Sequence, residues 1–240
     1  DKARKAVIDY DQCVHCGACK IACPFGAISD RSMIVQVIQR IKAGRRVYAL
    51  LAPAFIGQFG VQVKPGQVRA SLLKVGFHDV QEVSVGADAV AVEESREFIE
   101  RTKGSGGLMT TSCCPAFVGM VEKHLPEMKQ NVSSLVSPMV AMNVKKNDPE
   151  GIVVFVGPCI AKKSEAERYP GIVDYVMTFE ELATTIVGAG VNVTEMAASE
   201  FSSAGSKDGN IFAKAGGVLQ AVENVLAQLA PDVQVAAERC

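Results

Sequence analysis

The sequence predicts an α/β protein, or α+β when its parts are taken together: a small cysteine-rich module followed by a two-lobed domain with mainly parallel sheets flanked by helices. Short apolar runs typical of buried strands alternate with helical patterns after residue 46, and this alternation indicates a layered architecture. The 240 residues, 48% of them hydrophobic and 21% charged, are enough for a substantial core. Four of the eight cysteines lie between residues 13 and 23, which sets the module apart.

The cysteine-rich module covers residues 1–31. Its cysteines read Cys13-x2-Cys16-x2-Cys19-x3-Cys23-Pro24. This spacing is that of bacterial ferredoxins and predicts a [4Fe–4S] cluster. Zinc is the alternative, but zinc ligand pairs are usually separated by a longer loop. In two-cluster ferredoxins the fourth cysteine binds the other cluster, so Cys23 either closes a single cluster or binds a second one whose other ligands precede Asp1. We favour the second interpretation.

Residues 32–46 are expected to link this ferredoxin-like module to the larger domain. Apolar residues recur at helical spacing from Met33 to Ile41, and Gly44 ends the pattern. The larger domain, residues 47–240, opens on an apolar run from Val47 to Pro53 that is typical of a buried parallel strand. The next elements are expected as a helix over 65–76, a strand over 79–85 and a helix over 87–103.

The sequence Thr-Thr-Ser-Cys-Cys-Pro-Ala-Phe at 110–117 puts two adjacent cysteines at a junction between elements. Residues 107–111 are expected to form a short buried strand, and Pro115 suits the first turn of a helix that continues to Leu125. Free N–H groups and the dipole at a helix start favour a thiolate, so Cys113 and Cys114 are candidates for metal binding or acid–base chemistry. Two buried structural thiols are the alternative.

A second round of the same pattern follows residues 125–135, near which the two lobes are expected to meet. A helix is expected over 137–146, a strand over 152–156, a helix from about 161, a capped helix over 178–188, a helix over 215–229 and a strand over 233–236. Cys159 follows its strand much as Cys114 follows the earlier one. Because sites in open α/β sheets form at the carboxyl ends of strands, the two lobes are expected to share a buried metal site.

Lys162 and Glu165 follow Cys159 and share one face of the expected helix. The ammonium can hydrogen-bond an anionic ligand of a metal, and the carboxyl can pass protons. The alternative is that the Lys162-Lys163 doublet and Glu165 form an ordinary solvated helix face.

These motifs resemble the iron-only ([FeFe]) hydrogenase large subunit. The resemblance rests on Thr-Ser-Cys-Cys-Pro at 111–115 and Pro-Cys-x-x-Lys-Lys-x-Glu at 158–165, and it covers nearly the whole chain. The motifs that fall in the family's order also include the cysteine run, Ala52-Pro53-Ala54, Gly86-Ala87-Asp88 with Glu93-Glu94, Ser137-Pro138 and Gly216-Gly217-Val218. Ser-Pro-Met at 137–139 and Gly-Pro-Cys at 157–159 are similar to one of the family's less-studied subgroups.

The resemblance implies an enzyme that catalyses 2H⁺ + 2e⁻ ⇌ H₂ at an H-cluster, a [4Fe–4S] cubane joined through a cysteine to a two-iron unit carrying CO and cyanide. Matched by motif, the cubane ligands are Cys114 and Cys159, the proton donor is Cys113, and a cyanide is held by Lys162. The family's proton path matches Glu165, Ser133, Glu94 and Glu97. By the same resemblance, the other residues that bind the cofactor are Pro53, Ala54, Pro158 and Met139. The N-terminal cluster is expected to relay electrons.

The sequence departs from the family at several positions. The family commonly has Met, Trp and Gln where this chain has Gly157, Phe117 and Met139. Its third motif, Met-Ala-Cys-x-Gly-Gly-Cys, supplies the two other cubane ligands, and Cys240 in Ala-Glu-Arg-Cys does not match it. The catalytic domain is therefore expected to be incomplete at its C-terminus, with an intact H-cluster only in a full-length parent.

Composition limits the partners. A formal net charge of −1 gives no electrostatic case for nucleic acid or a membrane surface, and no apolar run is long enough to span a bilayer. Closely spaced metal-binding cysteines indicate a reducing cytoplasm. The resemblance implies a ferredoxin or similar electron carrier, H₂ and protons as substrates, and maturation proteins for the two-iron unit. The alternative is a non-catalytic relative that senses H₂ or serves iron–sulfur assembly or electron transfer, but assembly relatives typically lack the first cysteine of the pair, here Cys113.

Overall fold

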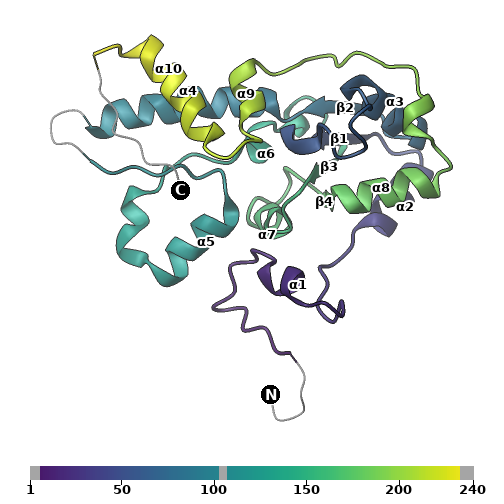
Figure 1. Cartoon of the computed structure of the whole chain (residues 1–240), viewed down its shortest axis with the longest axis horizontal. Coiled ribbons are helices and arrows are strands. Elements are labelled where there is room, and N and C mark those ends of the chain that lie inside the picture. Colours follow the sequence, from purple (N-terminus) through teal and green to yellow (C-terminus); the bar gives the residue numbers. More distant parts are fainter. Residues whose placement is uncertain (1–5, 103–106, 233–240) are drawn as a thin grey trace.

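The computed structural model describes residues 6–102 and 107–232. At its centre lies a four-stranded sheet in the order β2-β1-β3-β4, with every neighbouring pair parallel. The strands are β1 (Val47–Leu51), β2 (Asp79–Glu82), β3 (Ile152–Gly157) and β4 (Tyr175–Thr178). The predicted α/β class with a parallel sheet is confirmed (Figure 1).

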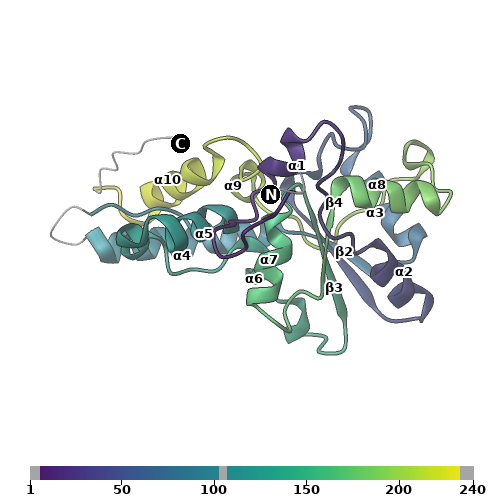
Figure 2. The same cartoon turned by 90° about the horizontal axis from the view of Figure 1, so that it is seen from below.

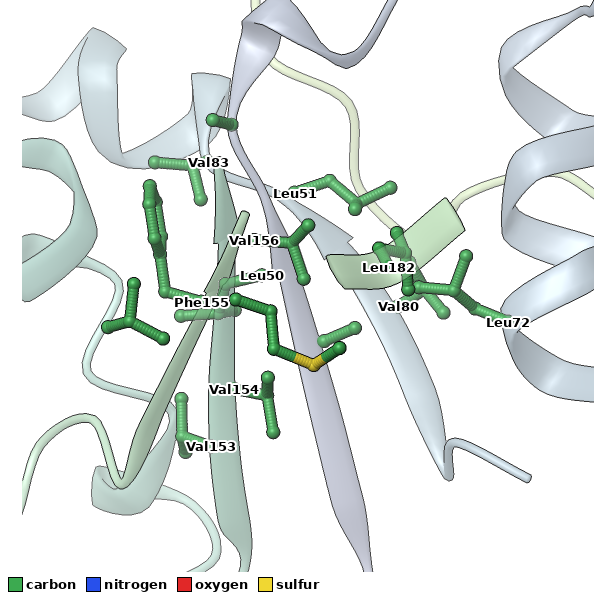
Figure 3. Packing of buried hydrophobic residues seen from close by; sticks show 14 of the residues in the cluster. Leu50, Leu51, Leu72, Val80, Val83, Val153, Val154, Phe155, Val156 and Leu182 are labelled. Atoms are coloured by element: carbon green, nitrogen blue, oxygen red, sulfur yellow. The ribbon is translucent and has the colours of Figure 1, made fainter. Parts of the chain in front are cut away.

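The sheet is buried on both faces, which explains why β1 and β3 read as unbroken apolar runs. Successive side chains of a strand alternate between the two faces. Leu50 lies on one face with its neighbour Phe155, whereas Leu51 lies on the other face, toward Leu72 and Leu182 of the flanking helices (Figure 3). The core of the protein therefore lies on both sides of these two central strands.

Helices cover both faces of the sheet (Figures 1 and 2). On one side lie α2 (Ile34–Lys42), α3 (Pro65–Val75) and α8 (Phe179–Gly188). On the other side lie α4 (Ser84–Thr102), α6 (Pro138–Ala141) and α7 (Ala161–Arg168). The predicted helix start at Thr178 is confirmed, because Thr178 and Glu181 form a reciprocal capping box at the start of α8.

A second group of helices packs along α4, away from the sheet. It contains α9 (Lys207–Ile211) and α10 (Gly217–Leu229). The Ser95 hydroxyl of α4 donates to the Val222 carbonyl of α10 at 3.2 Å. The Ser206 N–H, just before α9, donates to Asp88 of α4 at 2.7 Å. Helix α5 (Pro115–His124) lies beside α7 instead.

The N-terminal module consists of loops and one short helix, α1 (Ala18–Ala22), and it lies next to α7 (Figure 1). Isolated 3-10 turns complete the fold at Pro53–Phe55, Pro126–Asn131, Val144–Lys146 and Val193–Glu195.

Three predicted elements differ from the structure. Residues 107–111 do not form a strand: Thr110 makes a single bridge to Val132, and Leu108 is exposed, because no neighbouring strand lies alongside. The helix expected over 137–146 ends at Ala141, and Asn143 breaks it with a positive φ of 27° that Asn tolerates better than most residues. Helix α4 begins at Ser84, which shortens the strand expected over 79–85.

Three elements, α1, β4 and α9, have no counterpart among the predictions. Strand β4 has four residues, too few to show a period in the sequence. Helix α9 has five residues and contains Gly209 and Asn210, both poor helix formers, although Ser206 caps it through the Asp208 and Gly209 N–H groups. The strand predicted over 233–236 lies outside the described residues.

Replacing Gly217 with alanine is expected to destabilise the protein by about 1–3 kcal/mol. A Cβ atom at Gly217, the first residue of α10, would lie 1.7 Å from the Ile211 carbonyl oxygen, so the end of α9 would have to move. Gly188→Ala is the matched control, because a Cβ atom at that helical glycine meets nothing within 4 Å. Urea denaturation measures both, and equal stability of the two variants would contradict this packing argument.

Candidate functional site

The candidate site lies at the carboxyl edge of the sheet, where β1 and β3 are neighbours. From β1 the chain continues to β2 on one side, and from β3 it continues to β4 on the other, so this is the switch point at which open α/β sheets bind ligands. Strand β1 leads into Pro53 and Ala54, and β3 leads into Pro158 and Cys159. The sheet therefore brings two of the predicted motifs to the same edge.

Gly157, the last residue of β3, is closely enclosed. A Cβ atom there would lie 2.6 Å from the Phe155 ring and 3.2 Å from the Ala52 Cβ. The ring of Phe155 thus occupies space that a larger side chain at position 157 would need. The Phe155 ring thus explains why this chain can carry glycine at position 157, where the family that it resembles commonly has methionine.

Cys113 and Cys114 precede α5, and their thiols differ in exposure. Cys114 is the N-cap residue of α5 and is exposed, whereas Cys113 is less exposed. Burial raises the pKa of the Cys113 thiol to about 11, and the nearby Glu94 carboxyl adds to the rise. The expectation that the helix start favours a thiolate at both positions is therefore wrong for Cys113, because burial and the Glu94 charge outweigh Lys162 and Thr111, which favour the thiolate. Cys113 keeps its proton, as an acid must.

Cys159 lies close to the same pair. Burial raises its pKa, and both the Cys114 thiol and the Lys162 ammonium act on it electrostatically. A thiol of raised pKa binds iron only by losing its proton, so metal binding at Cys159 should weaken as the pH falls. The alternative of two buried structural thiols does not fit Cys114, which is exposed.

On α7, Glu165 is buried and Lys162 is largely shielded from solvent, so the alternative of a solvated helix face is excluded. The Lys162 ammonium donates to Glu165 Oε2 at 2.7 Å and to the Cys113 carbonyl at 3.1 Å. Their side chains are 12% and 6% exposed. The expected shared face of Lys162 and Glu165 is thus confirmed, and the ammonium joins α7 to the segment that carries Cys113.

Glu94 of α4 is completely buried beside this segment. The Ser112 N–H donates to Glu94 Oε1 at 3.2 Å, and Oε2 has no hydrogen-bond partner among the described residues. Burial raises the pKa of Glu94 to about 7, although the Ser112 N–H and the Ser133 hydroxyl oppose the rise. A carboxyl with this pKa can both take up and release a proton near neutral pH.

Ser133 and Glu97 continue from Glu94 toward the surface. The Ser133 hydroxyl donates to Glu97 Oε2 at 2.5 Å, and the Ser134 N–H donates to Glu97 Oε1 at 2.9 Å. Arg101, which is about one third exposed, pairs with Glu97 at 2.6 Å. Burial opposes ionisation of Glu97, but these hydrogen bonds and the Arg101 charge outweigh it and lower its pKa.

Four of the predicted proton-path residues are neighbours, whereas Glu165 and Met139 stand apart from them. Cys113, Glu94, Ser133 and Glu97 form a line in which Glu94 acts on the pKa of Cys113 and Ser133 on that of Glu94, and the Ser133 hydroxyl then donates to Glu97. Glu165 does not join this line, because its described hydrogen bond is to Lys162. Met139 is buried in α6, which packs against α4, and no described contact joins it to the thiols.

The N-terminal cysteines lie in a loop shaped for thiolates. The His15 N–H donates to Cys13 Sγ at 3.4 Å, and the Ala27 N–H donates to Cys23 Sγ at 3.3 Å. His15 and Gly17 take left-handed conformations with φ of 59° and 81°, which turn the chain sharply between Cys13 and Cys19. The hydrogen bond from Ala27 leads those that lower the pKa of Cys23, as a metal-binding thiol requires.

The spacing of the four cysteines in this loop is that of a [4Fe–4S] cubane site. The four thiolates around a [4Fe–4S] cubane each bind a different iron, so they need not converge on one point. N–H groups directed at sulfur are a feature that tunes such clusters.

Sequence reasoning missed several residues that complete the site. Arg101 lies four residues after Glu97 on the same helix, a spacing that could have identified it as the partner of Glu97. Ser112 belongs to a recognised motif, yet its contacts to Glu94 and to the Leu135 carbonyl depend on tertiary folding.

A parallel α/β sheet with thiols at its switch point, next to a cysteine loop suited to a cubane, defines an iron–sulfur redox protein. Residues 45–239 match the family described as iron only hydrogenase large subunit, C-terminal domain, and residues 6–29 match the 4Fe-4S binding domain. The chain belongs to the iron-only hydrogenase large subunit family. Its cofactors are accordingly iron–sulfur clusters, with a [4Fe–4S] cluster in the N-terminal module.

Known hydrogenases are similar to this chain over most of its length. Iron hydrogenase 1 of Clostridium pasteurianum is 34% identical over 82% of this chain and 39% of its own length. The periplasmic [Fe] hydrogenase large subunit of Nitratidesulfovibrio vulgaris is 33% identical over 92% of this chain and 67% of its own length. An apo form of the [FeFe]-hydrogenase HydA1 from Chlamydomonas reinhardtii superposes with a TM-score of 0.70 at 26% identity, covering 83% of this chain and 59% of that one.

The chain spans about two fifths of the length of the first of these relatives. Separately, among the described residues no helix is both long and apolar enough to cross a membrane.

Proposed function

We propose that this chain forms the proton-handling part of an [FeFe] hydrogenase that catalyses 2H⁺ + 2e⁻ ⇌ H₂. Support comes above all from one observation: the Cys113 thiol lies near the Glu94 carboxyl, which is completely buried and whose Oε2 has no hydrogen-bond partner among the described residues. Heterolytic H₂ chemistry needs an acid–base group in a site shielded from water and a relay that connects it to solvent.

In this proposal Cys114 and Cys159 hold the cubane, and the Lys162 ammonium binds an anionic ligand of the two-iron unit. The H-cluster, when bound, supplies the irons at which H₂ is formed or split. Glu165 acts as the charge partner of Lys162, which its 2.7 Å ion pair supports, rather than as a proton carrier. The buried Lys162 charge then remains paired and its ammonium fixed in direction.

Protons pass from Cys113 to Glu94, then through Ser133 to Glu97 and the surface at Arg101. The thiol of Cys113 is the acid, and Glu94 is poised to exchange protons near neutral pH. The Ser133 hydroxyl both accepts and donates, so it can connect the two carboxyls. The pKa of Glu97 is lowered, so Glu97 is ionised and, once protonated, releases its proton readily at the surface.

We further propose that Pro53, Ala54, Pro158 and Met139 enclose the two-iron unit. Three of these residues follow strand ends at the switch point, and Met139 is 1% exposed. Apolar walls of this kind keep water away from the cofactor.

For the module we propose that Cys13, Cys16, Cys19 and Cys23 hold iron–sulfur clusters that relay electrons, with Cys23 available to a second cluster. Residues 1–31 then act as the relay module, 32–46 as its link and 47–240 as the catalytic domain, with its lobes meeting near 125–135. A ferredoxin or similar carrier is the proposed electron partner, and maturation proteins supply the two-iron unit. The cytoplasm is the proposed compartment, because the thiols must stay reduced.

A non-catalytic relative, acting in H₂ sensing, cluster assembly or electron transfer, is the weaker candidate. Such a protein has no need to keep Glu94 buried without full hydrogen bonding, which costs free energy. The deciding experiment is H₂-dependent reduction of viologen dye by a matured longer chain that carries the two further cubane ligands. We expect reduction of the dye; intact cluster absorption with no dye reduction would contradict the catalytic proposal.

A further inference from the structure

Lys163, the second lysine of the doublet, is as buried as its neighbour but faces the other way. Its side chain is 10% exposed. The ammonium donates to Asp30 Oδ2 and to the Arg31 carbonyl, both at 2.6 Å, and to Glu181 Oε2 at 3.1 Å. Helix α7 thus directs Lys162 toward the thiols and Lys163 toward the N-terminal module.

Asp30 connects this ammonium to the cysteine loop itself. Its other oxygen, Oδ1, accepts from the Lys20 ammonium at 2.6 Å, and Lys20 lies on α1 between Cys19 and Cys23. Burial opposes ionisation of Asp30, but the hydrogen bonds from Lys163 and Lys20 outweigh it and lower its pKa to about 2. Asp30 therefore stays charged between two lysines at any physiological pH.

Glu181 completes the set on the side of α8. Its Oε1 accepts from the Met33 N–H at 3.0 Å, and its Oε2 accepts from the Thr178 N–H at 2.7 Å. Every charge in the set is therefore paired. Buried ion pairs contribute little net stability, because desolvation offsets attraction, but they can fix one relative orientation of two parts.

The other contacts of the module are made on α5 and at the start of α7. Lys123 donates to the Tyr10 and Cys13 carbonyls at 2.8 and 2.9 Å. A Cβ atom at Gly17 would lie 2.9 Å from Ile160 Cδ1, so the cysteine loop packs directly on the residue after Cys159. The module thus lies across two helices, of which α5 begins directly after Cys114 and α7 begins two residues after Cys159.

We propose that Lys163, Asp30 and Lys20 form a docking latch that fixes the iron–sulfur module on α7 and sets the separation between its cluster and the Cys114–Cys159 site. Lys163 and Asp30 are positioning residues, which act through the module and touch neither cofactor. That this separation serves electron transfer rests on the proposed function. Electron transfer over distance falls off steeply with separation, so a module that tilts away would relay electrons slowly even with both clusters intact.

The test compares Lys163→Met and Lys163→Arg in the full chain loaded anaerobically with iron and sulfide. Methionine keeps the length and apolar body of lysine without its charge, whereas arginine keeps the charge. Asp148→Asn is the matched control, because Asp148 forms an equally short ion pair with Arg46 at 2.6 Å away from the module. A general loss of stability would affect the control as well.

The first measurement is amide hydrogen exchange over residues 18–23, where the Lys20 and Ile21 N–H groups donate to the Gly17 carbonyl. Three hydrogen bonds to a charged group are lost in Lys163→Met, so we expect exchange there to be faster on the order of 100-fold, with near-normal exchange in Lys163→Arg and Asp148→Asn. Unchanged exchange in Lys163→Met would overturn the latch.

The second measurement is the electron paramagnetic resonance signal of the reduced module cluster. In a longer chain that also binds the cubane at Cys114 and Cys159, we expect magnetic coupling between that cubane and the module cluster in wild type and Lys163→Arg. We expect this coupling to be lost in Lys163→Met. Coupling retained in Lys163→Met would overturn the positioning role. A wild type that binds iron only in the module would count against the proposed function, while the exchange measurement would still decide the latch.

Discussion

Replacing Cys113 with alanine is expected to abolish turnover and leave the cluster iron in place, whereas Cys114→Ala is expected to remove that iron. The two residues are adjacent, but only Cys114 is exposed, as the N-cap of α5, while burial raises the pKa of Cys113 to about 11. Loss of a positioned acid lowers a rate on the order of 10²- to 10⁴-fold. The measurements are iron per chain and H₂ production from reduced viologen in the matured enzyme.

Opposite outcomes at two neighbouring thiols are the distinctive part of this prediction. A general effect of removing a thiol at the start of α5 would change both variants in the same way. Loss of iron from Cys113→Ala would show that Cys113 is a ligand of the cluster. Normal turnover of Cys113→Ala with normal iron content would exclude Cys113 as the proton donor.

Replacing Glu94 with glutamine is expected to stabilise the fold by about 3 kcal/mol at about pH 8. The pKa of Glu94 is about 7 in the folded protein, against an ordinary value of 4.5. As the pH rises from 4.5 through 7, the unfolded chain ionises first, so the free energy of unfolding falls across this window and stays low above it. Glutamine is neutral throughout and avoids this loss.

The same substitution is expected to slow turnover on the order of 10²- to 10⁴-fold, because an amide cannot accept the proton of Cys113 and pass it on. If Glu94→Gln raises the free energy of unfolding and lowers the turnover rate, the buried carboxyl is kept for function and not for stability.

Glu97→Gln is the matched control for the effect on stability. The pKa of Glu97 is lowered, so its charge contributes stability that is present above its ordinary pKa and lost as the pH falls through its folded value. Glu97→Gln should therefore destabilise the protein at about pH 8, opposite in sign to Glu94→Gln. Denaturant titrations at about pH 5 and about pH 8 measure both, and destabilisation by Glu94→Gln at the higher pH would contradict its raised pKa.

The fold was predictable where local pattern and tertiary burial agree. Strands β1 and β3 are unbroken apolar runs, because helices cover both faces of the sheet. Residues 107–111 have a similar apolar start, yet they find no strand to pair with. Strand β4 was missed because four residues at the sheet edge carry too little pattern.

The site was predictable where a motif carries it. The adjacency of Cys113 and Cys114 and the spacing of Lys162 and Glu165 are visible in the sequence. Whether a thiol is buried is not visible, and burial is what keeps Cys113 protonated. The partners of Lys163 lie more than 130 residues away at Asp30 and Arg31, so only the folded chain brings them together.

Exchange of H₂ with D₂O tests the central claim most directly, because it requires proton transfer at the site but no electron carrier. The account predicts HD formation by the matured wild type and by Lys163→Met, in which only the electron path is altered. It predicts almost none from Cys113→Ala or Glu94→Gln at equal iron content. Exchange at the wild-type rate in either of these two variants would contradict a proton path that runs from Cys113 through Glu94.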